Sequence, residues 1–249
     1  MHARFHAPEA ERVGDVVPLP SEEAEHLTRV LRLKAGAPVR VFNGRGSEFD
    51  AVVERADKKS ALVRLGSARK AAREARVAVT LAQAVLKRDK MDDVVRDAVM
   101  MGAVAIQPVV TARSESTLAS LARGRRRERW SSIAVASAKQ SGRAVVPVIL
   151  EPLTFEATVA SIPAETLPAP CLMFVEPAGA GAATSISELD LAAPGRATIL
   201  IGPEGGWTAD EIERGAAVSR QVVLGGRILR ADAMATVALT ALSTLWRDL

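Results

Sequence analysis

The feature that most constrains the fold is a change of pattern after residue 76, where short apolar segments begin to alternate with amphipathic ones. The apolar segments lack a regular polar alternation, which is typical of strands that are buried on both faces. We expect strands over residues 77–85, 104–110, 145–150, 171–176, 197–201 and 221–224. We expect helices over about 88–101, 127–140, 208–218 and 232–246. This alternation predicts an α/β domain whose parallel sheet is covered by helices on both faces.

Two of these helices have further support in their residues. The helix over 88–101 places its apolar residues on one stripe, which is formed by Met91, Val94, Val95, Ala98 and Val99. Thr208-Ala-Asp-Glu211 matches a capping box, which predicts that a helix begins at this point.

The first 76 residues have a different pattern. Short alternating runs at 39–42, 49–53 and 61–65 predict strands, and the turn Asn43-Gly44-Arg45-Gly46 separates the first two. They predict a small antiparallel barrel or sheet, preceded by a capped helix that starts at Ser21. Segment 66–76 is basic and lacks bulky apolar residues, so we place a boundary there, between domains 1–72 and 73–249.

The sequence lacks the residues that several kinds of catalytic and metal-binding sites require. The single cysteine, Cys171, lies in an apolar segment, where a buried structural thiol is favoured over a nucleophile. The three histidines all lie within the first 26 residues, and neither a G-x-x-x-x-G-K-[ST] loop nor a G-x-S-x-G elbow occurs. We therefore expect no metal site and no conventional triad. Without an apolar run long enough to span a membrane or a signal peptide, we expect a cytoplasmic protein.

The charge is unevenly distributed along the chain. Residues 1–73 contain 14 basic and 10 acidic residues, residues 74–150 contain 13 and 7, and residues 151–249 contain 6 and 12. A basic face on a nearly neutral protein suits a polyanion such as nucleic acid. The alternative is a solvated surface in an arginine-rich chain.

Glycines are concentrated at the ends of two predicted strands. One loop is Gly202-Pro203-Glu204-Gly205-Gly206, and the other runs from Gly225 to Arg230. Ligands of parallel sheets bind beyond the carboxyl ends of the strands, and glycines let the backbone approach a ligand. These loops therefore predict a pocket built largely from main chain, although each could simply turn a strand into a helix.

Taken together, the motifs resemble the RsmE-type family, the small-subunit ribosomal RNA uridine N3-methyltransferases of the knotted SPOUT superfamily. His26-x-x-Arg29-Val30-Leu31-Arg32 resembles a motif of the family's PUA-like barrel. Gln83, Lys87 and Lys90-Met91 resemble the start of its methyltransferase domain. Segments 140–143, 200–206, 224–225 and 228–230 are similar to its central motif and cofactor signature.

The resemblance implies a small PUA-like RNA-binding β-barrel domain followed by a SPOUT methyltransferase domain with a C-terminal trefoil knot. It also implies an S-adenosylmethionine cofactor, 16S ribosomal RNA or the small ribosomal subunit as partner, and a homodimer whose active site uses both subunits. The implied cofactor residues are Val175, Glu176, Ile201, Gly202, Pro203, Glu204, Gly205, Gly206, Leu224, Gly225, Ile228 and Leu229. The basic residues expected to contact RNA are Arg29, Arg32, Lys87, Lys90, Arg125, Arg126 and Arg143.

The implied methyl transfer requires no covalent nucleophile from the protein. A methyl on a sulfonium is already activated, so the enzyme aligns donor and acceptor and excludes water. Uridine N3 must lose a proton, and a two-pronged guanidinium on a carbonyl oxygen would favour the anion. Arg230 is the candidate for this role and Asp232 is a candidate proton acceptor, whereas the alternative for Arg230 is a structural role at the next helix.

The chain departs from the family pattern at seven positions. They are Asp97, Met100, Lys139, Ala231, Asp232, Ala233 and Met234, where the family usually has Lys, Glu, Glu, Thr, Glu, Thr and Ala. Met100 falls on the otherwise polar face of its predicted helix, where it has no evident role in folding. These departures leave two other functions open. One is a related knotted methyltransferase that modifies another RNA atom, such as a ribose 2′-hydroxyl, and the other is a non-catalytic RNA-binding or ribosome-assembly protein.

Overall fold

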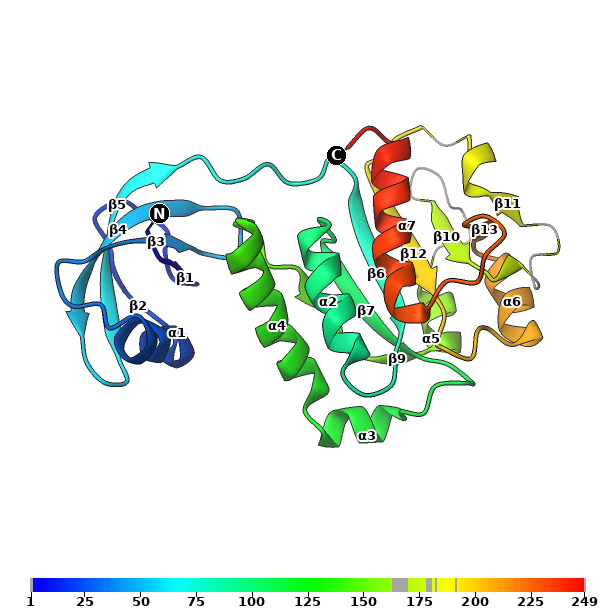
Figure 1. Cartoon of the computed structure of the whole chain (residues 1–249), viewed down its shortest axis with the longest axis horizontal. Coiled ribbons are helices and arrows are strands. Elements are labelled where there is room, and N and C mark those ends of the chain that lie inside the picture. Colours follow the sequence, from blue (N-terminus) through cyan, green and yellow to red (C-terminus); the bar gives the residue numbers. More distant parts are fainter. Residues whose placement is uncertain (1, 163–169, 178–180, 182, 191, 249) are drawn as a thin grey trace. The chain divides into compact units, whose positions relative to one another are not determined.

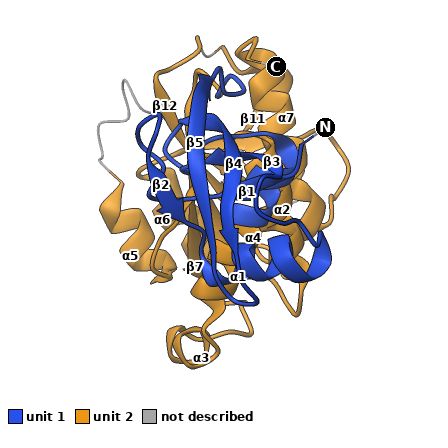
Figure 2. Cartoon of the chain, turned by 90° about the vertical axis from the view of Figure 1, so that its left-hand side faces the viewer, with its two compact units in different colours: residues 1–74, 135–146 blue, residues 75–134, 147–249 orange. Residues whose placement is uncertain are grey.

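A computed structural model describes residues 2–162, 170–177, 181, 183–190 and 192–248 (Figure 1). The chain divides into two units, of which unit 1 contains residues 1–74 and 135–146 and unit 2 contains residues 75–134 and 147–249 (Figure 2). Unit 1 therefore includes a segment from the middle of the chain in addition to the N-terminal one. Within the described residues, no helix has both the length and the apolar character that crossing a membrane requires.

Unit 1 is built on a five-stranded sheet in the order β1-β3-β4-β5-β2. The strands are β1 (Arg4–His6), β2 (Val16–Pro18), β3 (Pro38–Phe42), β4 (Glu48–Ala56) and β5 (Ala61–Arg69). All neighbours pair antiparallel except β1 and β3, which are parallel. The register shifts twice between β4 and β5, and such bulges bend and twist a strand pair. The predicted antiparallel sheet is therefore confirmed for β3, β4 and β5, while the sequence did not predict the two three-residue strands.

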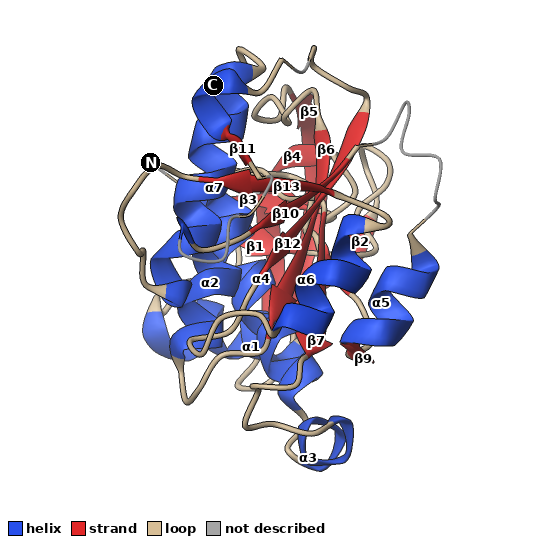
Figure 3. Ribbon diagram, turned by 90° about the vertical axis from the view of Figure 1, so that its right-hand side faces the viewer, coloured by secondary structure: helices blue, strands red, loops and turns tan. Residues whose placement is uncertain are grey.

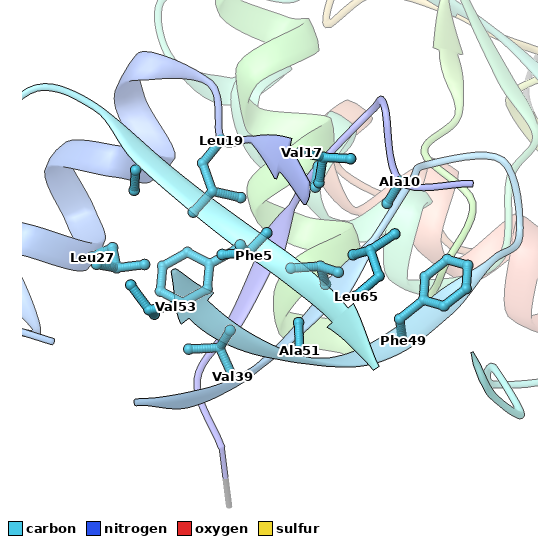
Figure 4. Close-up of a cluster of buried hydrophobic side chains, with 14 of the residues drawn as sticks. Phe5, Ala10, Val17, Leu19, Leu27, Val39, Phe49, Ala51, Val53 and Leu65 are labelled. Carbon is cyan, nitrogen blue, oxygen red and sulfur yellow. The ribbon is translucent and has the colours of Figure 1, made fainter. Parts of the chain in front are cut away.

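The core of unit 1 lies on one face of this sheet (Figure 4). Val39, Ala51, Val53, Val63 and Leu65 alternate with exposed or half-buried residues along their strands, as a sheet with one covered face requires. Phe5 and Leu27 belong to the same cluster, so β1 and the helical segment after β2 close this core.

Unit 2 contains a parallel sheet in the order β11-β13-β10-β12-β6-β7-β8, with β9 paired to β7. Its strands are β6 (Ala78–Ala84), β7 (Ala105–Val110), β8 (Val148–Ile149), β9 (Leu153–Thr154), β10 (Cys171–Phe174), β11 (Thr184–Ser185), β12 (Arg196–Ile201) and β13 (Arg220–Val223). Every pairing is parallel, as the unbroken apolar segments predicted. Cys171 is buried in β10, as predicted, and burial raises the pKa of its thiol to about 12, which disfavours the nucleophilic thiolate.

Helices cover both faces of this sheet, with α2 and α7 on one side and α5 and α6 on the other (Figure 3). The helices that begin in unit 2 are α2 (Lys90–Met100), α3 (Leu118–Arg123), α4 (Arg126–Ser141), α5 (Phe155–Ser161), α6 (Ala209–Ala216), α7 (Ala231–Leu245) and the short 3-10 helix η3 (Ile186–Glu188). The predicted apolar stripe of α2 is buried along its whole length, and the capping box at Thr208 and Glu211 is present at the start of α6. The α/β prediction is therefore confirmed.

Three local predictions were wrong. The helix α1 (Ser21–Glu25) begins at Ser21 without a side-chain cap, because Pro20 occupies the capping position, and a π-helical turn η1 (His26–Val30) follows it. The apolar run 145–150 forms only the two-residue β8, because residues up to 146 belong to unit 1. The strand expected over 61–65 is longer than predicted, since pairing with β4 continues β5 to Arg69.

Candidate active site

A cavity of about 340 Å³ lies beyond the carboxyl ends of β10, β12 and β13 in unit 2. This volume falls in the range of pockets that hold drug-sized ligands. The segments that line it are Phe174–Pro177, Ile201–Glu204, Gly206–Trp207 and Arg227–Ala231, together with Lys90, Leu224 and Met234. The parallel register brings three strand ends to one edge of the sheet, so segments far apart in sequence meet here.

Two glycines of the loop after β12 are required by close packing. A Cβ on Gly202 would lie 3.1 Å from the indole ring of Trp207. Gly206 has φ +68°, a left-handed conformation that L residues rarely adopt, and a Cβ there would lie 3.0 Å from a carboxylate oxygen of Glu176. Glycine at these positions lets Trp207 and Glu176 pack directly against the loop backbone.

Trp207 connects this loop to the end of the neighbouring strand. Its indole Nε1 donates a 2.9 Å hydrogen bond to the carbonyl of Phe174, and its ring packs at 5.3 Å from that of Phe155. Only 7% of Trp207 is exposed, although it contributes to the cavity wall. The indole therefore holds the ends of β10 and β12 together beside the cavity.

Glu204 lies among cationic and backbone donors at the cavity wall. Its Oε1 accepts bonds from the backbone N–H of Lys87 at 3.1 Å and from Nζ of Lys90 at 3.3 Å. Burial raises the pKa of Glu204, but the hydrogen bonds and the charge of Lys90 outweigh it and lower the pKa below its usual value. Glu204 is therefore ionised at neutral pH and holds the ammonium group of Lys90 at the cavity.

Arg230 and Asp232 form a two-pronged ion pair. Nε of Arg230 lies 3.0 Å from Oδ1 of Asp232, and NH2 lies 2.6 Å from Oδ2. The hydrogen bond from Arg230 lowers the pKa of Asp232. Arg230 lines the cavity and its side chain is 75% exposed, whereas Asp232 does not contribute to the lining.

The structure brings together all of the predicted cofactor residues except Gly205 and Gly225, which do not line the cavity. It adds residues that the loop patterns did not single out: Lys90, Phe174, Pro177, Trp207, Arg227, Ala231 and Met234. Phe174 and Pro177 flank the predicted Val175-Glu176 pair, so widening that segment would have found them. Lys90 was predicted to contact RNA, and its place at the cavity depends on the packing of α2 against the sheet.

The predicted RNA-binding residues are not all on the surface. Arg29 is exposed and lies 3.6 Å from Glu25, and Arg32 and Arg125 are also exposed. Arg126 is half-buried, and Lys87 pairs with Glu115 at 2.6 Å. Arg143 has only 6% exposure and forms a 2.6 Å ion pair with Glu74 within unit 1. This burial makes Arg143 a structural residue, so we do not include it in an RNA surface.

The sequence has five arginines within residues 123–129, a run that looks too dense for its members to pair with carboxylates, but three of them do so in the structure. Arg125 pairs with Glu128, Arg127 with Glu151, and Arg129 with Asp92. Two of these carboxylates lie more than twenty residues away in sequence, so the run itself did not reveal them.

Two departures from the family pattern, Lys139 and Met100, do not line the cavity. Lys139 pairs with Glu23 at 2.8 Å, contacts Nδ1 of His26 at 3.0 Å and lies over the ring of Phe5. Its change is therefore accommodated inside unit 1. Met100 is 44% exposed, and nothing in the structure of one chain explains an apolar residue there.

Known protein families match the two parts of the chain in the same order. Residues 73–243 match the RNA methyltransferase domain family, and residues 19–66 match the RNA methyltransferase PUA domain family. Ribosomal RNA small subunit methyltransferase E of Synechocystis sp. is 34% identical over 92% of this chain and 73% of its own length. The protein of the same name from Rickettsia conorii is 30% identical over 91% of this chain and 88% of its own.

Two solved structures cover almost the whole chain. Ribosomal RNA small subunit methyltransferase E of Neisseria gonorrhoeae, bound to S-adenosylmethionine, has a TM-score of 0.87 at 29% identity and covers 99% of this chain and 98% of its own. A Legionella pneumophila protein in complex with the same cofactor has a TM-score of 0.88 at 26% identity and covers 98% of both chains.

Proposed function

The chain belongs to the RNA methyltransferase family that includes ribosomal RNA small subunit methyltransferase E, and on this premise we propose that it methylates N3 of a uridine in 16S ribosomal RNA with S-adenosylmethionine. The observation that carries this proposal is the cavity at the ends of β10, β12 and β13, which gathers the glycine loop, Glu176 and the segment Ile228–Arg230. The predicted trefoil knot is part of the proposal.

The residues of the cavity fit S-adenosylmethionine. The space beside Gly206 that a Cβ would fill borders the Glu176 carboxylate, so ligand, loop backbone and an acidic group can meet there. We propose that the loop at Gly202–Gly206, with Leu224, Ile228 and Leu229, holds the cofactor, and that Glu176 complements its positive charge. Gly225 shapes the turn before Ile228 with φ +80°. The bound cofactor supplies a methyl group already activated on a sulfonium.

We propose that the ion pair of Arg230 and Asp232 opens when uridine enters. Arg230 then donates its two-pronged hydrogen bonds to a uridine carbonyl and stabilises the negative charge that develops there. Without its guanidinium partner, the pKa of Asp232 rises from its lowered value, which makes the carboxylate a better acceptor for the N3 proton. The N3 proton would pass to an oxygen of Asp232 and then to solvent, which leaves the N3 electron pair free to accept a methyl group. The bound cofactor would supply that methyl group and keep the electron pair of its sulfur–methyl bond.

RNA binding and assembly complete the proposal. Exposed Arg29, Arg32 and Arg125, with Arg126 and the cavity's Lys90, provide cationic contacts for phosphate. The segment Ala233–Leu245 of α7 has no charged residue. Within it, Val237 is 40% exposed and Leu245 is 37% exposed. We propose that a second copy of the chain covers this face, because an uncharged exposed helix face favours association. We also propose a cytoplasmic location, because a ribosomal substrate would be met there.

The test is mass spectrometry of nucleosides from 16S ribosomal RNA of a strain that lacks the gene. We expect N3-methyluridine to disappear and to return when purified protein and S-adenosylmethionine are added to small subunits from that strain. An unchanged N3-methyluridine level with loss of a 2′-O-methylated nucleoside would support the related ribose methyltransferase. Unchanged modification altogether would support the non-catalytic RNA-binding protein.

A further inference from the structure

Close packing, rather than an unusual backbone conformation, explains glycine at position 205. Gly205 does not line the cavity, and its φ lies outside the left-handed region that favours glycine. A Cβ at this position would lie 3.2 Å from Cδ and 3.3 Å from Cβ of Arg113. Glycine at 205 therefore allows the Arg113 side chain to lie directly on the backbone of the loop.

The close contact with Gly205 brings the Arg113 guanidinium within hydrogen-bond distance of the loop backbone. Its NH1 donates to the carbonyl of Gly205 at 2.5 Å and to the carbonyl of Trp207 at 3.2 Å. One guanidinium thus spans the turn that contains Gly206, whose backbone forms part of the cavity wall. Hydrogen bonds from a charged group contribute more to stability than neutral ones.

The segment that carries Arg113 is itself held in place. It follows β7, and Thr111 and Ser114 on either side of Arg113 share a 2.9 Å hydroxyl contact. Glu211, which is only 3% exposed, accepts from the backbone N–H of Ala112 at 2.9 Å and from that of Thr208 at 2.9 Å. The loop after β7 is therefore joined to both ends of the 205–208 turn.

We propose that Arg113 is a positioning residue, which holds the Gly205–Trp207 turn in the conformation that binds the cofactor. It acts through Gly206 and Trp207, because Arg113 itself is not among the residues that line the cavity. Its effect on Trp207 needs no ligand, whereas its effect on cofactor affinity rests on the proposed function.

The test uses tryptophan emission together with cofactor binding. Trp130→Phe and Trp246→Phe leave Trp207 as the single tryptophan in a chain without tyrosine. In this background, Arg113→Ala should increase acrylamide quenching of Trp207 without ligand and raise the Kd for S-adenosylmethionine about tenfold. Arg113→Lys should change quenching and Kd less than Arg113→Ala does, since an ammonium still donates to carbonyls. Arg214→Ala is the matched control, because Arg214 pairs with Asp210 on α6 and is an exposed arginine outside the cavity.

A double-mutant cycle separates positioning from general stability. Gly205→Ala should displace the Arg113 side chain and weaken binding by itself. It should weaken binding less in the Arg113→Ala background, where the contact with Cδ at 3.2 Å is gone and only the contact with Cβ at 3.3 Å remains. Additive effects, or a folded Arg113→Ala protein with wild-type quenching and affinity, would overturn the proposal. If Arg113→Ala does not fold, Arg113→Lys and Gly205→Ala give the same readouts. Failure of the unsubstituted protein to bind S-adenosylmethionine would refute the proposed function instead, while the quenching result would still decide the role of Arg113.

Discussion

Replacing Gly206 by alanine or valine tests the cavity at its most restricted backbone position. Gly206 has φ +68°, and the left-handed conformation costs an L residue about 1–2 kcal/mol. The new Cβ would also lie 3.0 Å from Oε1 of Glu176, so this carboxylate must move by a few tenths of an ångström. Because residue 206 and Glu176 both line the cavity, we expect Gly206→Val to weaken S-adenosylmethionine binding at least tenfold, about 1.4 kcal/mol.

Gly102 provides a matched control within unit 2. It has φ +91°, and a Cβ there would lie 3.2 Å from the Cβ of Ala75, which is not a cavity residue. Gly102→Ala and Gly206→Ala should therefore destabilise the fold similarly, by about 1–2 kcal/mol in urea titrations, because both adopt the left-handed conformation. Only the change at Gly206 should reduce affinity in titration calorimetry. A folded Gly206→Val protein that binds with wild-type affinity would place the cofactor elsewhere.

Three further predictions concern catalysis, RNA and pH. Arg230→Ala should slow single-turnover methyl transfer by roughly 10²–10³ with little change in cofactor affinity, and Arg230→Lys should recover only part of the rate; a lower melting temperature with a normal rate would instead assign Arg230 a structural role. Alanine at Arg29, Arg32, Arg125 and Arg126 should weaken RNA binding. The slope of the logarithm of the binding constant against that of the salt concentration should become smaller by nearly one unit for each lost phosphate contact. An unchanged slope would show that these arginines are only solvated. Burial and then the charge of Lys139 lower the pKa of His26 in the folded state. The contribution of His26 to the free energy of unfolding is therefore fully present above its unfolded pKa of about 6.5 and declines as the pH falls below that value. In a pH series of urea titrations, His26→Gln should flatten this decline, and an unchanged profile would contradict the assignment.

The elements that sequence predicted correctly depend on neighbours along the chain. The stripe on α2 repeats with helical spacing, and the capping box of α6 needs only Thr208 and Glu211. Buried strands such as β6 and β12 are largely apolar because helices cover both faces of the sheet. From parallel strands, the location of a pocket at their carboxyl ends follows without knowledge of their order.

Contacts between residues far apart in sequence required the tertiary structure. Glu74 and Arg143 are 69 residues apart, and no local pattern distinguishes this buried arginine from one that could bind RNA. Arg113 and Gly205 are 92 residues apart, so sequence predicted a ligand for this glycine where the fold places a guanidinium. Local spacing determines which residues share a face, but only the folded chain decides which faces meet, because charges and close packing act through space.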